Sequence, residues 1–162
     1  MLKNKFYTSL KEFFLPPVPA ELEDKIHSAV ANYVKNNGLQ TRFTWMDYNI
    51  DEINQWAWKN ISPDVYFGIQ IITDEGLGIH QDQSSHIKLL YYLDTGGNNV
   101  TTTFYADPDG KVILESHVIP AKKWFSFDTQ VWHDVKNVES LRYALVATVN
   151  YNQREHAIQN YK

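Results

Sequence analysis

The sequence predicts a mainly β domain that is preceded by two helices. From Val65 onward, short runs rich in β-branched and aromatic residues alternate with turn residues at intervals of about 8–12 residues, the spacing typical of a β-sandwich or barrel. The chain has 162 residues and is 43% apolar, which is enough for one hydrophobic core. We therefore expect a single domain over 1–162, with a helical N-terminal support (1–62), a β core (63–151) and a polar tail (152–162).

Two helices are predicted in the N-terminal part. Residues 1–20 are expected to be irregular, because they end in a proline-rich stretch. Apolar residues then recur at helical spacing over 20–37, and Gly38 supplies a stop. A second helical pattern covers 51–60 and ends before Pro63. Each helix would have one apolar face, which needs a surface to cover.

About eight strands are predicted after the helices. Besides the extended segment around His80, the predicted strands are 65–73, 86–93, 100–105, 111–118, 122–128, 131–135 and 141–151. The last strand is apolar on both faces, so one face should line a barrel interior while the other packs under the N-terminal helices. The sequence thus favours helices packed on one sheet of a barrel or sandwich.

Composition and charge exclude several classes of partner. The net charge of -4 leaves no basic surface of the kind that tracks phosphates, so no nucleic acid is expected as a partner. The absence of cysteine excludes disulfides and thiolate ligands. No run is long and apolar enough to span a membrane, and the first residues lack the apolar stretch of a secretion signal. A cytoplasmic location without a membrane partner is therefore expected.

A candidate metal site begins with Gly78-Ile79-His80-Gln81-Asp82. On an extended strand, side chains two residues apart point to the same face, so His80 and Asp82 can reach one shared point. His133 is the best candidate for a third ligand from elsewhere in the chain. Two histidines and a carboxylate with open positions suit Fe(II) and O2 chemistry, and they also suit zinc. Six histidines and 19 acidic residues make a chance surface pair the competing interpretation.

Arg142 is the second candidate functional residue. It lies between Leu141 and Tyr143 in the apolar last strand, where a guanidinium is rarely buried without a partner. A bound carboxylate would match its bidentate fork. The competing interpretations are a pair with a distant acid such as Asp128 or Asp134, or exposure on an outer face.

The order of these parts resembles the 2-oxoglutarate and Fe(II)-dependent dioxygenases of the prolyl-4-hydroxylase-like group, in their compact phage and bacterial form. The resemblance covers roughly residues 65–151. Its motifs here are His80-Gln81-Asp82, Tyr91-Tyr92-Leu93-Asp94, Gly96-Gly97 with Thr103-Phe104, Pro120 with Phe125 and Phe127, His133, and Arg142. It implies a double-stranded β-helix, a cupin-like jelly roll, whose mouth holds iron.

The resemblance also implies a role for each site residue. The Fe(II) ligands and catalytic centre would be His80, Asp82 and His133. Arg142 would pair with the C5 carboxylate of the cosubstrate 2-oxoglutarate, Tyr92 would hydrogen-bond the same carboxylate, and Gln70 stands where many relatives have a tyrosine facing the cosubstrate. The implied reaction uses O2 to hydroxylate a substrate and decarboxylates 2-oxoglutarate to succinate. Neutral imidazoles are required, so metal binding should fail below about pH 6.

Two other functions remain open. A non-catalytic jelly-roll binding module would keep the fold, and a Zn hydrolase would use the same three ligands. Arg142 favours the oxygenase, because a hydrolase does not need a buried guanidinium beside its metal. The substrate is expected to be a protein or peptide side chain, or alternatively a small molecule.

Overall fold

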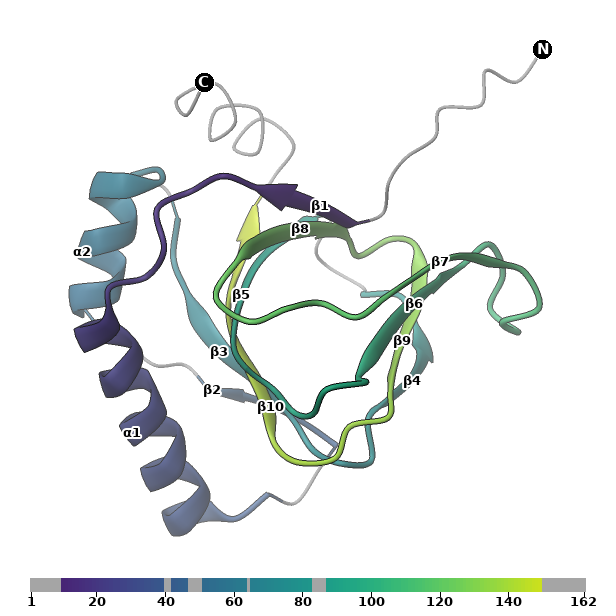
Figure 1. The fold of residues 1–162 in the computed structure, drawn as a ribbon, viewed down its shortest axis with the longest axis horizontal. Helices are drawn as coiled ribbons and strands as arrows, with labels where there is room; N and C mark the ends of the chain where they lie inside the picture. The colour runs from purple at the N-terminus through teal and green to yellow at the C-terminus, as the bar shows by residue number, and fades with distance from the viewer. Residues whose placement is uncertain (1–9, 40–41, 47–50, 64, 83–86, 150–162) are drawn as a thin grey trace.

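The computed structural model in Figure 1 describes residues 10–39, 42–46, 51–63, 65–82 and 87–149. The helices are α1 (Ala20–Asn37) and α2 (Asp51–Asn60). The strands are β1 (Leu10–Phe13), β2 (Phe43–Met46), β3 (Gly68–Ile72), β4 (Leu77–His80), β5 (Ile87–Thr95), β6 (Thr101–Tyr105), β7 (Ile113–His117), β8 (Trp124–Asp128), β9 (Trp132–Lys136) and β10 (Arg142–Val149). The predicted tail, 152–162, lies outside the described residues.

Both helices begin and end where the sequence predicts. Glu21 and Glu23 lie in the first turn of α1, where acidic side chains interact favourably with the helix dipole. Gly38 ends this helix with a φ of 69°, and its N–H donates to the carbonyl of Val34 at 2.9 Å. A positive φ is readily adopted by glycine, which explains the stop. Within the described ranges, neither helix combines the length and apolar character that crossing a membrane requires.

The strands form two antiparallel sheets that enclose a common interior (Figure 1). The larger sheet has the order β1-β8-β5-β10-β3-β2, and the smaller has the order β4-β9-β6-β7. The chain passes repeatedly from one sheet to the other, so that strands distant in sequence become neighbours. This mainly β, antiparallel arrangement agrees with the predicted fold class and is consistent with a jelly roll.

The N-terminal part adds two strands that the sequence did not predict. Residues 1–20 were expected to be irregular, but β1 pairs with β8 at one edge of the larger sheet. At the other edge, β2 pairs with β3. Both strands have four residues, too few for an alternating pattern to stand out from a loop. Their pairing depends on partners distant in sequence, so the N-terminal part extends the sheet as well as supplying helices.

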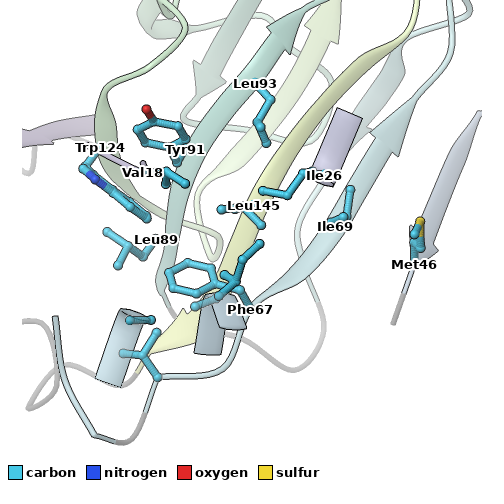
Figure 2. Packing of buried hydrophobic residues seen from close by; sticks show 14 of the residues in the cluster. Val18, Ile26, Met46, Phe67, Ile69, Leu89, Tyr91, Leu93, Trp124 and Leu145 are labelled. Atoms are coloured by element: carbon cyan, nitrogen blue, oxygen red, sulfur yellow. The ribbon is translucent and has the colours of Figure 1, made fainter. Parts of the chain in front are cut away.

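Buried side chains lie on both faces of the larger sheet. One cluster joins Ile26 of α1 and Ile53 of α2 to Leu145 of β10, and Figure 2 shows part of this cluster. A second cluster fills the interior between the sheets and includes Ala144 and Val146 of β10. Strand β10 is therefore apolar on both faces, as predicted.

A polar contact also joins α1 to the larger sheet. The Tyr91 hydroxyl donates to Glu23 Oε1 at 2.6 Å, and Lys122 Nζ lies 2.9 Å from Glu23 Oε2. Burial and the neighbouring carboxylate raise the pKa of Tyr91, so its phenol stays protonated at neutral pH. These contacts lie on the helix side of β5, which leaves the opposite face of β5 for the interior.

Candidate metal centre

Two neighbouring strands of the smaller sheet bring the two candidate histidines together. Strand β4 pairs with β9 so that His80 lies directly opposite His133. Side chains of directly opposed residues share a face of the sheet, and the two imidazole centroids are 4.3 Å apart. Asp82 follows two residues after His80, beyond the end of β4. Antiparallel pairing of β4 with β9 therefore brings together two histidines that are more than 50 residues apart in sequence.

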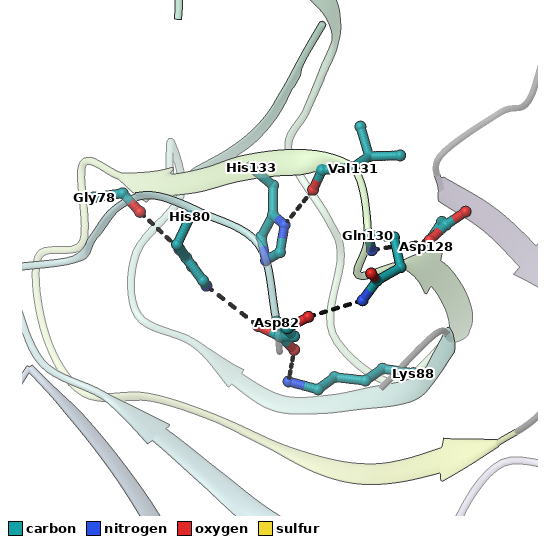
Figure 3. A network of polar contacts seen from close by, with 8 residues as sticks. All are labelled: Gly78, His80, Asp82, Lys88, Asp128, Gln130, Val131 and His133. Atoms are coloured by element: carbon teal, nitrogen blue, oxygen red, sulfur yellow. Dashed lines mark hydrogen bonds and ion pairs between the residues drawn. The ribbon is translucent and has the colours of Figure 1, made fainter. Parts of the chain in front are cut away.

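The backbone of Asp82 is held by the turn between β8 and β9. The Asp82 N–H donates to the carbonyl of Thr129 at 3.0 Å, and the side-chain amide of Gln130 donates to the Asp82 carbonyl at 2.7 Å (Figure 3). The Gln81 amide donates in turn to the carbonyl of Gln130 at 2.5 Å. These bonds fix the segment that carries the carboxylate against the strand that carries His133.

Both histidines are oriented by the same kind of hydrogen bond. His80 Nδ1 lies 2.7 Å from the carbonyl of Gly78, and His133 Nδ1 lies 2.8 Å from the carbonyl of Val131 (Figure 3). A carbonyl only accepts, so Nδ1 is protonated in both rings and Nε2 is the nitrogen that a metal would use. A backbone carbonyl behind a metal-ligating histidine is a common orienting contact.

The three side chains form one group that can hold a metal ion. Ligand atoms of His80, Asp82 and His133 all lie within 4.8 Å of one another. His80 Nε2 is 3.5 Å from Asp82 Oδ1, so the carboxylate turns one oxygen toward the imidazoles. The structure therefore brings together the three residues that the sequence singled out. Their role as metal ligands remains a prediction.

Burial and charge set the protonation of this group. Burial lowers the pKa of His133 to about 4. The hydrogen bond to Asp82 raises the pKa of His80 above its ordinary value of 6.5. Burial would raise the pKa of Asp82, but contacts with His80 and Lys88 outweigh it and hold the pKa well below its usual range. At neutral pH the carboxylate is ionised and His133 is neutral.

These shifts predict how metal binding depends on pH. A metal must displace the proton of His80, so the affinity for Co(II) should begin to fall at a pH above 6.5. Below that point it should fall by about one log unit per pH unit, because one proton competes. A second proton should compete only near pH 4, where His133 titrates. Titrations with Co(II) between pH 4 and 8 test this, and a slope of two beginning near pH 6 would contradict it.

Arg142 is buried without an acidic partner. Its side chain is fully enclosed, and its guanidinium carbon lies 4.0 Å from the centroid of the Tyr92 ring. Nη1 donates to the carbonyl of Thr95 at 3.0 Å, Nη2 makes a long contact of 3.5 Å with the Thr102 hydroxyl, and Nε has no hydrogen-bond partner. Among the described residues, no carboxylate forms an ion pair with it.

Among the residues that the structure describes, neither competing interpretation of Arg142 holds. It is not exposed on an outer face, and it does not pair with Asp128 or Asp134. Asp134 instead accepts from Tyr105 at 2.8 Å and pairs with Lys136 at 2.8 Å. The guanidinium thus keeps donor capacity for an anion that the described chain does not supply.

Tyr92 and Gln70 lie on the same interior face as this guanidinium. Ala144 of β10 lies between its two pairing partners, Tyr92 of β5 and Gln70 of β3. The side chains of Ala144, Tyr92 and Gln70 therefore point to the same face of the sheet. Tyr92 and Gln70 are both buried. Their contact with a cosubstrate stays a prediction.

Strand β6 contacts Arg142 and also pairs with the strand that carries His133. Thr102, which Arg142 touches, is two residues from Phe104, and Phe104 lies opposite His133. A two-residue step along a strand covers about 6.6 Å. A small diacid could therefore lie between the two sites, with one end at the metal and the other at Arg142.

Lys88 is a charged residue of this site that the sequence did not predict. It lies in β5, its side chain is only 12% exposed, and its ammonium nitrogen is 2.5 Å from Asp82 Oδ2 (Figure 3). The sequence does contain a signal for this residue. Lys88 lies between Ile87 and Leu89 in an apolar run, where a buried charged side chain needs a partner, as Arg142 does.

No protein-family model matches the chain, and no curated protein sequence matches it either. Solved structures do match. HygX from Streptomyces hygroscopicus, with nickel and 2-oxoglutarate bound, has a TM-score of 0.56 and 7% identity, with 89% of this chain and 84% of HygX covered. A prolyl hydroxylase from Trichoplax adhaerens, in complex with a hypoxia inducible factor peptide, has a TM-score of 0.55 and 12% identity, with 93% and 88% covered.

The carbocyclase SnoK from nogalamycin biosynthesis is similar to the same degree. Its TM-score is 0.56 at 10% identity, with 88% of this chain and 80% of SnoK covered. The chain spans only 46% of the length of another matched structure, EvdMO1. Fold and site together give a mainly β, antiparallel protein that brings two histidines and one carboxylate close together. Its fold is shared with solved structures of 2-oxoglutarate-dependent oxygenases, including prolyl hydroxylases, as the resemblance implied.

Proposed function

We propose that the protein is an Fe(II)- and 2-oxoglutarate-dependent oxygenase. The observation that carries this proposal is the combination of the His80, Asp82 and His133 triad with a buried guanidinium that has no acidic partner among the described residues. A metal site alone would suit a Zn hydrolase equally well. The guanidinium distinguishes the two, because a 2-oxo diacid places a second carboxylate at a distance from the metal and a hydrolytic water does not.

Each site residue has a defined part in this proposal. His80 and His133 bind Fe(II) through Nε2, and Asp82 binds it through the oxygen turned toward the imidazoles. Arg142 binds the C5 carboxylate of 2-oxoglutarate, while Tyr92 stacks on the guanidinium and Gln70 faces the cosubstrate. The bound iron supplies the activation of O2 that decarboxylates 2-oxoglutarate to succinate.

The proposed reaction is hydroxylation, and the proposed substrate is a peptide side chain or a small molecule. The Trichoplax enzyme was crystallised with a peptide, which supports a peptide substrate, whereas SnoK is a carbocyclase of the same fold. The same fold thus serves different reactions. We further propose that 1–162 forms one cytoplasmic dioxygenase domain, with 1–62 as its support.

The proposed function predicts a spectroscopic signal. Under anaerobic conditions, Fe(II) and 2-oxoglutarate together should give the parent protein a visible charge-transfer band, because the 2-oxo acid chelates the metal. Neither component alone should produce the band. A 2-oxo monoacid, which lacks the carboxylate that would pair with Arg142, should give a much weaker band at the same concentration. Absence of the band with both components present would contradict the cosubstrate assignment and leave a metal-binding module as the better description.

A further inference from the structure

Lys88 projects into the interior of the barrel. Side chains of β5 alternate between the two buried clusters, with Leu89 and Tyr91 on the helix side and Leu90 and Tyr92 on the interior side. Strand geometry therefore places Lys88 on the interior face with Leu90 and Tyr92. A lysine on this face must place its ammonium group beside a polar partner. The partner is Asp82.

The two oxygens of Asp82 have different partners. Oδ1 lies 3.5 Å from His80 Nε2, whereas Oδ2 lies 2.5 Å from Lys88 Nζ (Figure 3). The side chains of Asp82 and Lys88 are 16% and 12% exposed, so water screens this ion pair poorly. A carboxylate held in this way offers one oxygen to the imidazoles and has the other committed to an ammonium group.

We infer that Lys88 is a positioning residue that restricts Asp82 to one metal-binding oxygen. This inference rests on the proposed function, because that function needs three open positions on a six-coordinate metal. Two imidazoles and one carboxylate oxygen leave three positions, two for the 2-oxo acid and one for O2. A carboxylate bound through both oxygens would leave only two, and the 2-oxo acid would fill them.

Removing the ammonium group of Lys88 should strengthen metal binding, whereas the loss of a purely structural contact would not. In Lys88→Met, Oδ2 is free to join the metal, and a positive charge close to the dication is removed. Both effects favour the bound metal, so the affinity for Co(II) should rise about tenfold or more. The absorption spectrum of bound Co(II) should also change, because it reports the coordination number. The metal-free variant should unfold at a lower temperature, because Asp82 loses its ion-pair partner.

Open positions can be counted with nitric oxide, which binds Fe(II) at the position that O2 needs. In the anaerobic parent with Fe(II) and 2-oxoglutarate, nitric oxide should give its characteristic electron paramagnetic resonance signal. In Lys88→Met the same mixture should bind nitric oxide at least about tenfold more weakly, because the second carboxylate oxygen occupies the position. Without 2-oxoglutarate, both proteins should bind it.

Lys136→Met is the matched control. Lys136 also pairs with a buried aspartate, Asp134, at 2.8 Å, but that pair includes none of the metal ligands. This variant should leave Co(II) affinity and the nitric oxide signal unchanged. If Lys88→Met does not fold, Lys88→Gln removes the charge while keeping a donor, and it should shift Co(II) affinity in the same direction.

The outcomes separate the inference from the proposed function. Equal Co(II) affinity and equal nitric oxide binding in the parent and Lys88→Met would overturn the role of Lys88. Weaker Co(II) binding in Lys88→Met would also overturn it, because Lys88 would then assist binding rather than restrict Asp82. If the parent binds Co(II) but forms no complex with 2-oxoglutarate, the proposed function fails. The Co(II) comparison then still decides whether Lys88 restricts Asp82.

Discussion

Arg142→Met is expected to raise the melting temperature of the metal-free protein and to weaken strongly the binding of 2-oxoglutarate to the Fe(II) protein. The guanidinium is fully enclosed, its Nε has no hydrogen-bond partner, and no described acid balances its charge. Replacing buried charges by apolar side chains of similar volume is often neutral or stabilising, by about 1–4 kcal/mol. Arg142 therefore destabilises the protein when no ligand is bound, as expected of a residue whose role is to bind a ligand.

The loss of binding should be large. Removing one partner of a buried charge pair costs about 2–5 kcal/mol, which is a roughly 30-fold to 5,000-fold loss of affinity. The measurement is a titration of the anaerobic Fe(II) protein with 2-oxoglutarate, followed by its charge-transfer band. Fe(II) affinity measured without the cosubstrate should stay within a few-fold of the parent, because Arg142 is not a ligand of the proposed centre.

Arg42→Met is the matched control for Arg142→Met. Arg42 is an exposed arginine that pairs with Glu75 at 2.8 Å, and the two side chains are 61% and 62% exposed. The same substitution there should change neither the melting temperature by more than a few degrees nor the binding of 2-oxoglutarate. A lowered melting temperature in Arg142→Met together with unchanged binding would show that the guanidinium serves the fold and not a ligand.

The parts of the fold that the sequence predicts well are those with strong local patterns. Helix α1 has a long apolar periodicity, acidic residues at its start and a glycine stop, so its bounds follow from residues close together in sequence. Two residues of the triad follow from local spacing, because His80 and Asp82 are two residues apart in a segment predicted to be extended. His133 is a candidate from the sequence, but its pairing with His80 is a long-range contact that only the folded structure shows.

The parts that could not be predicted depend on partners distant in sequence. Strand β1 has a lysine and a glutamate among its four residues, and only its pairing with β8 makes it a strand. The partner of Lys88 is equally hidden although it lies only six residues away, because the sequence does not show which acidic side chain its ammonium group meets. The competing interpretations of Arg142 illustrate the same limit. Whether an acid approaches a buried guanidinium is a property of the folded interior.

His133→Leu should separate metal binding from folding. His133 is buried and its pKa is lowered to about 4, so a neutral imidazole of similar size to leucine packs there at neutral pH. The metal-free variant should therefore stay folded, losing mainly the hydrogen bond to the carbonyl of Val131. Removing one of three ligands should weaken metal binding by about two orders of magnitude, taking roughly 3 kcal/mol per ligand.

Thermal unfolding with and without Co(II) measures this loss. At a metal concentration of about 100 times the parent dissociation constant, the parent should be stabilised by about 2.7 kcal/mol and His133→Leu by only about 0.4 kcal/mol. His117→Leu is the control, because His117 lies on β7 and pairs with Glu115 at 2.9 Å. Its metal-dependent stabilisation should equal that of the parent. If His133→Leu were stabilised as strongly as the parent, His133 would be a packed interior histidine and the metal would need a different third ligand. If Co(II) did not stabilise even the parent, the close approach of the three side chains would have to be explained by hydrogen bonding alone.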